Sequence, residues 1–262
     1  WMQQSSFPFY CYTGHRQPTI NNFLTMNNNL QVQRHELKYY INQIDYQSAK
    51  SVLSQLMKQD SHQTNSSGYF IRSLYLDDLY DNSVEEKLAG IEKRDKYRLR
   101  IYDCKQNWVK LERKRKNGNF VNKTTTIITK REALHIINGQ YKELAKNYHN
   151  PDTYSIYYDF CQKYFHPVCI VDYYRDVFML DYNDIRITFD KQLRCNNENY
   201  DLFNPHLFTE PLMRPEIIVM EIKFNHFLPA WFKNIIHLES VTASAVSKYC
   251  QSRMHTKEYY FD

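Results

Sequence analysis

The stretch KYRLRIYD, which starts at Lys96, alternates like a β-strand but carries a row of cations on one face. Successive side chains of a strand point to opposite faces, so the cations share one face and the apolar side chains share the other. Six predicted strands, this one included, have such a row of polar and mostly charged side chains on one face. The rows are Arg34, Glu36 and Lys38; Lys96, Arg98 and Arg100; Lys110, Glu112 and Lys114; Lys123 and Thr125; Arg186, Thr188 and Asp190; and Glu221 and Lys223. We therefore expect a sheet with one charged face and one apolar face.

Eight strands and several helices follow from the periodicity of the apolar residues. The strands are predicted at 34–41, 69–78, 96–103, 108–116, 120–129, 168–180, 184–193 and 216–225. Helices are predicted at 45–60, in the stretch 79–90, and at 130–146, 153–165, 228–239 and 241–251. The first helix is expected to begin at an Asp45 or Ser48 cap. Asn117-Gly118 and residues 181–183 are expected to be hairpin turns.

Charged side chains on neighbouring strands would repel one another unless an anion or a metal ion lies nearby. Two cations about 4 Å apart repel by roughly 4 kcal/mol at an effective dielectric constant near 20. If the sheet closes or curls, the charged faces meet in a channel, and the apolar faces lie outside under the helices. A solvated sheet with scattered salt bridges is the alternative for any single strand, but the repetition of the pattern favours the channel.

The charge of the chain is concentrated in one region. The 262 residues carry a net charge of +5, whereas residues 93–116 hold eleven Lys or Arg against three acids and so carry +8. The remainder must then sum to −3. Such a zone predicts a localised anionic partner, with nucleic acid, phosphate compounds and anionic lipid as candidates.

Residues 1–33 differ from the rest in composition and are predicted to be a poorly ordered leader before a domain at 34–262. Because the first residue is Trp1, Met26 is a candidate for the native start. The six cysteines form no CxxC pair and are expected to be reduced thiols. No apolar run has the length of a membrane helix, which predicts a cytoplasmic protein. The oligomeric state is left open.

Eight segments between Arg34 and Cys250 resemble, in the expected order, the VTC domain, the polyphosphate polymerase branch of the CYTH or triphosphate tunnel metalloenzyme superfamily. The segments are RHELKYYI, IRSLYLDD, KYRLRIY, LERKRK, DYYRDVF, IRITFD, VMEIKF and SKY. The resemblance implies an α+β fold built on a closed antiparallel eight-stranded β-barrel, a tunnel with a charged interior that is covered outside by helices.

The resemblance also implies a set of site residues. The residues expected to bind phosphate are Lys38, Arg98, Arg100, Lys114, Lys123, Arg175 and Arg186. Glu221 resembles the family's metal-binding carboxylate, for Mn²⁺ or Mg²⁺, and Lys248 resembles its catalytic lysine. Glu36, Glu112 and Lys223 are possible additional members, and either glutamate could be only a salt-bridge partner. The implied partners are ATP and inorganic polyphosphate, and the implied reaction extends the polyphosphate chain.

Two departures bear on the reaction. Arg34 stands at the first Glu of the ExExK signature that hydrolytic relatives carry, which favours the polymerase branch. Thr124 follows Lys123 where relatives often have another basic residue, which suggests weaker affinity for long chains. A triphosphatase of the same fold and a non-catalytic polyphosphate-binding subunit remain as alternatives. Nucleic-acid binding is the least favoured, because the aromatic residues mostly occupy the apolar face of the strands.

Asp77 and Asp78 are adjacent in sequence and could be mistaken for a metal-binding pair. Neighbouring strand residues point to opposite faces, so we expect a turn or capping role instead. Trp108 and Trp231 are expected to be core or covering-helix residues, and the histidines to be surface or packed residues.

Overall fold

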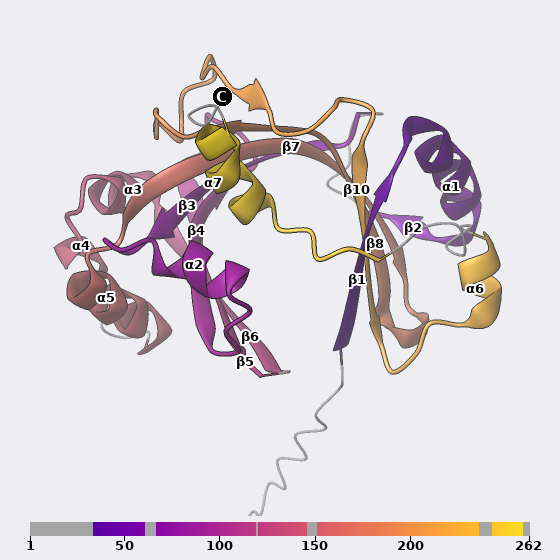
Figure 1. Cartoon of the computed structure of the whole chain (residues 1–262), viewed down its shortest axis with the longest axis horizontal. Helices are drawn as coiled ribbons and strands as arrows, with labels where there is room; N and C mark the ends of the chain where they lie inside the picture. Colours follow the sequence, from indigo (N-terminus) through magenta and orange to yellow (C-terminus); the bar gives the residue numbers. More distant parts are fainter. Residues whose placement is uncertain (1–33, 61–66, 119, 146–150, 236–242, 259–262) are drawn as a thin grey trace, which may run out of the picture. The chain divides into compact units, whose positions relative to one another are not determined.

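A single antiparallel sheet forms the framework of the described part of the chain (Figure 1). The computed structural model describes residues 34–60, 67–118, 120–145, 151–235 and 243–258. The strands are β1 (Arg34–Ile41), β2 (Lys58–Gln59), β3 (Tyr69–Asp77), β4 (Arg94–Ile101), β5 (Trp108–Asn117), β6 (Phe120–Thr129), β7 (His166–Leu180), β8 (Ile185–Asn196), β9 (Glu210–Pro211) and β10 (Ile218–Asn225). The long strands follow the order β1-β10-β8-β7-β3-β4-β5-β6, while β2 pairs with β7 and β9 with β8.

The described helices lie mostly on one side of this sheet. They are α1 (Gln43–Leu56), α2 (Asn82–Leu88), α3 (Lys130–Ile137), α4 (Lys142–Ala145), α5 (Pro151–Lys163), the 3₁₀ turn η1 (Tyr182–Asp184), α6 (Ala230–Ile235) and α7 (Lys248–Glu258). The α+β class is as predicted, and each predicted strand corresponds to one long strand. The predicted leader at 1–33 lies outside the described residues.

Helix ends differ from the prediction where a local cap or a glycine decides the boundary. The side chain of Asn42, not that of Asp45 or Ser48, caps α1 by accepting the backbone N–H of Asp45 at 2.8 Å. The single helix predicted over 130–146 is wrong, because the chain leaves α3 through Gly139 in a left-handed conformation, with φ of +72°, before α4.

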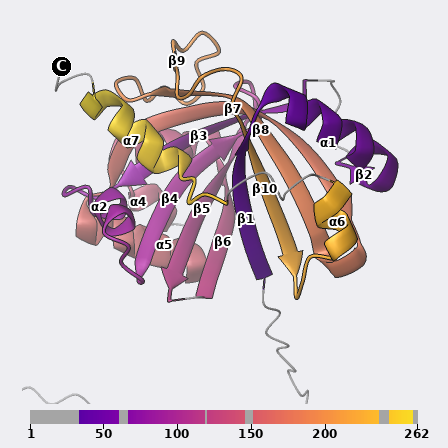
Figure 2. The ribbon, with the colours of Figure 1, turned by 45° about the vertical axis from the view of Figure 1, so that its right-hand side comes forward.

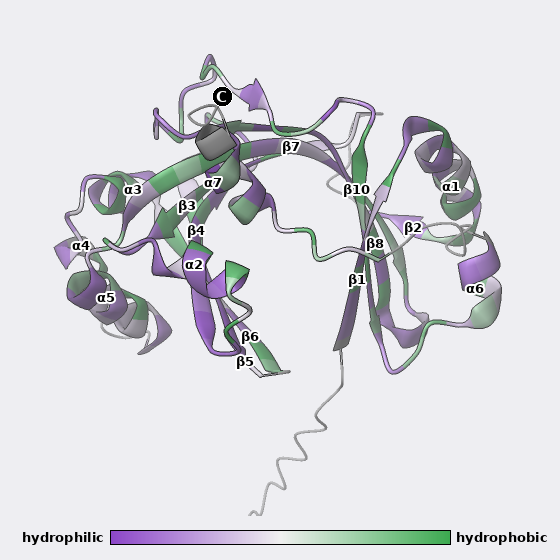
Figure 3. Cartoon of the chain, viewed as in Figure 1, coloured by the Kyte–Doolittle hydropathy of each residue, from purple (hydrophilic) through white to green (hydrophobic). Residues whose placement is uncertain are grey.

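The apolar side of the sheet is buried under helices, as the alternation predicted. One cluster joins α1 and α6 to β1, β8 and β10, and includes Leu53, Phe189, Ile222 and Phe232. A second joins α3, α4 and α5 to β3, β4 and β5. Figure 3 colours the strands in both hydrophilic purple and hydrophobic green, in keeping with strands that have one polar and one apolar face.

The predicted closed eight-stranded barrel is wrong. The sheet has ten strands, and in the described part of the chain its end strands β1 and β6 are not paired with each other. The free edge of β1 is already occupied: Ser244 donates its backbone N–H to the Lys38 carbonyl at 2.8 Å, and Ala243 bridges Tyr39. A strand has only two edges, so β6 cannot pair with β1 where this segment lies.

The sheet nevertheless curls strongly, as Figure 2 shows. Lys114 on β5 lies 3.6 Å from a carboxylate oxygen of Glu36 on β1, although five strands separate β5 from β1 in the hydrogen-bonded order. Only a curved sheet can bring these two side chains together. The charged faces of distant strands therefore meet without backbone closure.

Helix α7 covers one end of the side of the sheet on which the charged side chains meet. Residues 243–247, which fall in the helix predicted at 241–251, have no regular secondary structure apart from a single bridge. The helix begins after Ser247, whose hydroxyl accepts the backbone N–H of Cys250 at 3.4 Å. The Tyr249 ring lies 5.1 Å from that of Tyr75 on β3. With Val171 of β7 these rings belong to a third apolar cluster, so α7 is anchored by packing and starts at the border of the charged region.

The pair Asp77 and Asp78 caps helix α2, as predicted. Asp77 accepts the backbone N–H groups of Ser83 and Val84, and Asp78 accepts that of Asn82. Tyr249 of α7 donates its hydroxyl to Asp77, which ties α2 and α7 together. The carboxylates are therefore occupied by structural hydrogen bonds.

Candidate functional site

Strand register brings the predicted charged residues onto one face. Arg98 lies opposite Glu112, and Arg175 opposite Asp190, and such directly opposed residues point to the same side of an antiparallel sheet. We define the charged face as Glu36, Lys38, Lys96, Arg98, Arg100, Lys110, Glu112, Lys114, Lys123, Arg175, Arg186, Asp190, Glu221 and Lys223 of the strands, together with Lys248 of α7. Eleven of these side chains are cations and four are carboxylates.

Glu112 is the centre of one cluster on this face. Its carboxylate accepts from Arg98 at 2.5 Å, lies 3.7 Å from Arg100 and forms an ion pair with Lys123. Burial raises the pKa of Glu112, but the three cations lower it more, so the net pKa lies well below its ordinary value. The side chain is therefore an ionised anchor that holds three phosphate-binding candidates in place.

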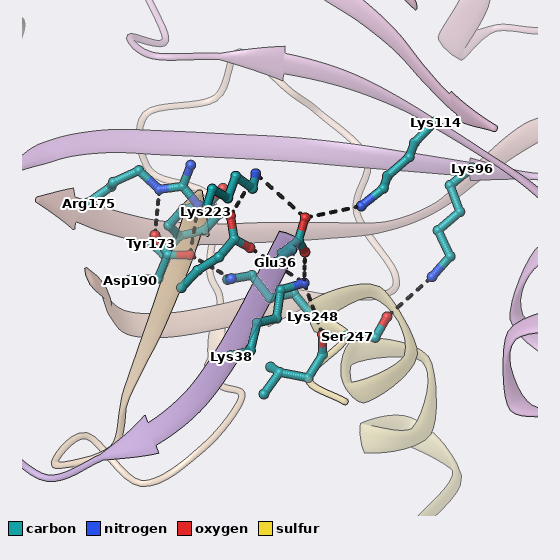
Figure 4. A network of polar contacts seen from close by, with 12 residues as sticks. Glu36, Lys38, Lys96, Lys114, Tyr173, Arg175, Asp190, Lys223, Ser247 and Lys248 are labelled. Atoms are coloured by element: carbon teal, nitrogen blue, oxygen red, sulfur yellow. Dashed lines mark hydrogen bonds and ion pairs between the residues drawn. The ribbon is translucent and has the colours of Figure 1, made fainter. Parts of the chain in front are cut away.

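Asp190 is the centre of a second cluster, which includes the predicted catalytic lysine (Figure 4). Arg175 donates to both oxygens of Asp190, at 2.6 and 2.8 Å, and Lys248 donates at 2.6 Å. Burial raises the pKa of Asp190, but Arg175 and Lys248 lower it to about 2. Arg175 and Lys248 also lie 5.3 and 5.1 Å from the centre of the Tyr173 ring. These contacts position the Lys248 ammonium group.

Two carboxylates, Glu36 of β1 and Glu221 of β10, meet where these two strands pair. Lys38 lies 2.7 Å from Glu36 and 3.4 Å from Glu221, and Lys223 lies 2.7 Å from Glu221. Burial raises the pKa of Glu221, but Lys223 and Lys38 lower it well below its ordinary value. For Glu36, burial and the charge of Glu221 raise the pKa, but the surrounding lysines lower it by more, so the net pKa lies below its ordinary value. Both carboxylates are therefore ionised and shared among several lysines.

Three cations on the charged face, Lys96, Lys110 and Arg186, have no carboxylate partner among the residues described, and Lys110 donates to the Tyr102 hydroxyl at 3.1 Å. Lys96 donates to the Ser247 hydroxyl at 3.2 Å and lies 5.0 Å from the centre of the Tyr249 ring. Burial, followed by the charges of neighbouring cations that include Lys114, lowers the pKa of Lys96 to about 8. For Arg186, the Nε atom is buried without a hydrogen-bond partner in the described chain. The charged face therefore keeps a cationic excess that its own acids do not neutralise.

A comparison with protein families gives one decisive match. The model of the VTC domain matches residues 33–256, which is most of the chain and includes every member of the charged face.

The chain belongs to the VTC domain family. This membership supports a function that involves polyphosphate or triphosphate. Among curated proteins no match was found.

Solved structures give more distant likenesses. A protein assigned as an adenylate cyclase from Bacillus halodurans is 11% identical with a TM-score of 0.43, and the match covers 88% of this chain and all of that one. The PH1819 protein of Pyrococcus horikoshii OT3 is 12% identical with a TM-score of 0.43, covering 86% of this chain and 99% of that one.

All twelve residues predicted for the site lie on the charged face of this VTC domain. The predicted set of site residues left out three neighbours: Asp190, which anchors Lys248; Tyr173, whose ring Lys248 contacts; and Lys96, which donates to Ser247 just before α7. The signal for Asp190 was present in the alternation of IRITFD, but the sequence did not show which cations it would meet.

A divalent metal ion on the charged face would need oxygen ligands from the VTC domain. No group of three or more His, Cys, Asp or Glu with metal-binding geometry occurs in the described ranges. Glu36 and Glu221, which share Lys38, are the carboxylates suited to the task. Mg²⁺ commonly takes only one or two protein carboxylates when substrate phosphates supply further oxygens, and Mn²⁺ also favours oxygen ligands, so this pair fits such an ion.

No described helix has the length and apolar character needed to cross a membrane.

Proposed function

We propose that this VTC domain is a polyphosphate polymerase, which transfers the terminal phosphoryl group of ATP to the end of a polyphosphate chain bound on the charged face. The observation that carries the proposal is the cationic excess of this face, gathered around Lys248, in a chain of the VTC family. In the reaction an oxygen of the terminal phosphate of the chain attacks the γ-phosphorus of ATP. The bond between the γ-phosphorus and the bridging oxygen breaks, and ADP leaves.

The cations of the charged face fit the needs of phosphoryl transfer. This reaction depends mainly on in-line positioning and on stabilising charge on the transferring group. Arg98, Arg100, Arg175 and Arg186 would bind phosphate oxygens, since a guanidinium group offers two parallel donors. The ammonium groups of Lys38, Lys114, Lys123 and Lys223 would add compact charges. Lys248 would contact the transferring phosphate.

The four carboxylates support this role by fixing the cations before substrate binds. Glu112 holds Arg98, and Asp190 holds both Arg175 and Lys248. Groups that are already oriented need little reorganisation when charge develops on the phosphate, which is how electrostatic stabilisation becomes effective. The proposal therefore assigns Glu112 and Asp190 a positioning role.

The proposal also assigns Glu221 and Glu36 to a Mn²⁺ or Mg²⁺ ion. When bound, such an ion would neutralise phosphate charge and polarise phosphate oxygens. Glu221 is nearly buried while Glu36 is more exposed, with side-chain exposures of 9% and 29%. We therefore expect Glu221 to matter more for metal affinity, because fewer waters compete for its oxygens.

The test is the identity of the product. The protein is incubated with ATP labelled at the γ-phosphate and with Mn²⁺, and the products are separated on a polyacrylamide gel. A ladder of long chains supports the polymerase. Labelled orthophosphate alone would instead indicate a triphosphatase of the same fold, and polyphosphate binding without turnover would indicate a binding subunit.

A further inference from the structure

Two polar groups on the charged side of β8, with one residue between them, find no hydrogen-bond partner among the residues that the structure describes. They are the Nε atom of Arg186 and the hydroxyl of Thr188, both buried and without a partner in the described chain. Thr188 is 3% exposed. The two residues are separated by one position in a strand, so their side chains leave the same face about 7 Å apart.

The choice of threonine at position 188 is informative. Across the strands it lies between Val177 of β7 and Glu221 of β10. A buried hydroxyl without a partner destabilises a folded protein, whereas valine has nearly the same shape and makes no such demand. Unsatisfied buried groups are rare in native structures and call for an explanation. A ligand that accepts a hydrogen bond from Thr188 provides one.

The pair of groups selects the class of ligand. The guanidinium of Arg186 can only donate hydrogen bonds, so it cannot be satisfied by a metal ion. The Thr188 hydroxyl can donate as well. A ligand that satisfies both must therefore present acceptor oxygens with negative charge, which is the chemistry of a phosphate group.

We propose that Arg186 and Thr188 form a phosphate subsite, in which the Nε–H and the hydroxyl donate to oxygens of one phosphate group. The proposal adds Thr188 to the binding set and rests on the proposed function only in requiring that the charged face binds phosphate. Lys223 lies opposite Arg186, and Glu221 lies opposite Thr188. The phosphate bound here therefore lies beside the carboxylate assigned to the metal ion.

The first experiment replaces Thr188 and measures binding of inorganic tripolyphosphate by calorimetry without divalent metal, together with the melting temperature of the free protein. Thr188→Val should weaken binding roughly tenfold, as expected for the loss of one hydrogen bond to a charged group. It should also raise the melting temperature by about 2 to 4 °C, because the unsatisfied hydroxyl is removed. Thr188→Ser, which keeps a hydroxyl, should bind within about threefold of the wild type.

Thr126→Val is the matched control. Thr126 is also a buried strand threonine, but its hydroxyl accepts from Thr153 at 3.3 Å on the opposite side of the sheet. This variant should bind tripolyphosphate like the wild type and should not gain stability. If Thr188→Val lost stability as well, its hydroxyl would have a partner in the free protein, and the proposal would be overturned.

A second experiment tests whether both residues contact one phosphate group. Arg186→Lys and Thr188→Val are combined, and their effects on tripolyphosphate affinity should be less than multiplicative, because either change already disturbs the shared group. Independent effects would contradict a shared phosphate, and an effect of Thr188→Val that required Mn²⁺ would make Thr188 a metal ligand instead.

The outcomes separate this proposal from the proposed function. Normal binding by Thr188→Val, with a wild type that binds and polymerises, would overturn the subsite alone. A wild type that binds tripolyphosphate through Thr188 but makes no polymer would overturn the polymerase alone. A wild type without affinity for tripolyphosphate would overturn both.

Discussion

Two arginine–aspartate pairs on neighbouring strands have the same geometry but different surroundings. Arg72 donates through Nε and Nη2 to Asp172 at 2.9 and 2.7 Å, and Arg175 donates through the same atoms to Asp190 at 2.6 and 2.8 Å. The Arg72 pair lies away from the charged face, where its remaining donors meet backbone carbonyls, including that of Asn204 at 2.6 Å. The Arg175 pair lies on the charged face beside Lys248.

The pKa values of the two acids shift in opposite directions. For Asp172, burial raises the pKa more than Arg72 lowers it, so the net shift is upward. For Asp190, burial again raises the pKa, but Arg175 and Lys248 together lower it to about 2. Asp172 is held chiefly by Arg72 in a structural pair, whereas Asp190 is shared by two cations of a face that carries an excess of positive charge.

The largest effect should come from breaking the structural pair. Arg72→Met leaves the Asp172 carboxylate buried without its partner, and we expect the free energy of unfolding to fall by about 3–5 kcal/mol. Urea unfolding measures this loss. The double variant Arg72→Met with Asp172→Leu should recover most of it, and activity per folded molecule should change less than about twofold. A loss below about 1 kcal/mol in the single variant would mean that the pair has no structural role.

Breaking the pair on the charged face should instead remove activity. Arg175→Met leaves Asp190 bonded to Lys248, so the fold should persist, whereas chain synthesis should fall by about 10²–10³-fold as transition-state stabilisation is lost. Gel assays of polymer with ATP and Mn²⁺ measure the rate, and circular dichroism checks the fold. The contrast would fail if Arg175→Met lost stability like Arg72→Met while each folded molecule kept full activity.

The excess of positive charge should also appear as a pH dependence of stability. The pKa of Lys96 is lowered to about 8, below its ordinary value of 10.5, so between these values the unfolded chain binds more protons than the folded one. Stability should therefore rise as the pH increases from about 8 towards 10. Lys96→Met should reduce this rise, although Lys114 and Lys123, whose pKa values are also lowered mainly by burial, should leave part of it.

Urea unfolding at pH 7.5 and 9.5 compares the two proteins. The same pH dependence in wild type and Lys96→Met would contradict the lowered pKa of Lys96 in the folded protein. Binding of tripolyphosphate near pH 8.5 should raise the pKa of Lys96 and so take up protons, which calorimetry in buffers of different ionisation enthalpy detects.

The smallest effect is expected where an ion pair is fully in water. Lys58 and Asp181 lie 3.0 Å apart, with side-chain exposures of 78% and 86%. Lys58→Met should change stability by less than about 1 kcal/mol and leave chain synthesis unchanged. Urea unfolding and the polymer assay check both points, and a large loss of activity would mean that the charged face is not the only functional surface.

Much of the charged face could be predicted because side-chain alternation assigns residues to faces whatever the pairing of the strands. Glu112 and Glu221 were assigned to the polar face from their own strands, and they lie there. The apolar clusters under the helices follow from the same alternation. The polar partners of each residue were harder to predict, because they depend on register between strands that are far apart in sequence, as for Lys114 and Glu36.

Two features could not be predicted from alternation. One is the failure of the sheet to close, which depends on residues 243–244 taking the edge of β1. The other is a change of face within β8, where Gln192 has a φ of +52° and the register with β7 shifts. Beyond it Leu193 joins the apolar cluster under α7, while Arg194 lies opposite Asp172.

The central claim is that the charged face, with Lys248 and Glu221, performs chain synthesis. Wild type, Lys248→Ala and Glu221→Ala are compared in one assay with labelled ATP and Mn²⁺, with Arg72→Met as a variant altered away from this face. We predict a ladder of long chains from wild type and from folded Arg72→Met, and at least about a hundredfold less product from the other two. Equal ladders from wild type, Lys248→Ala and Glu221→Ala would contradict the account.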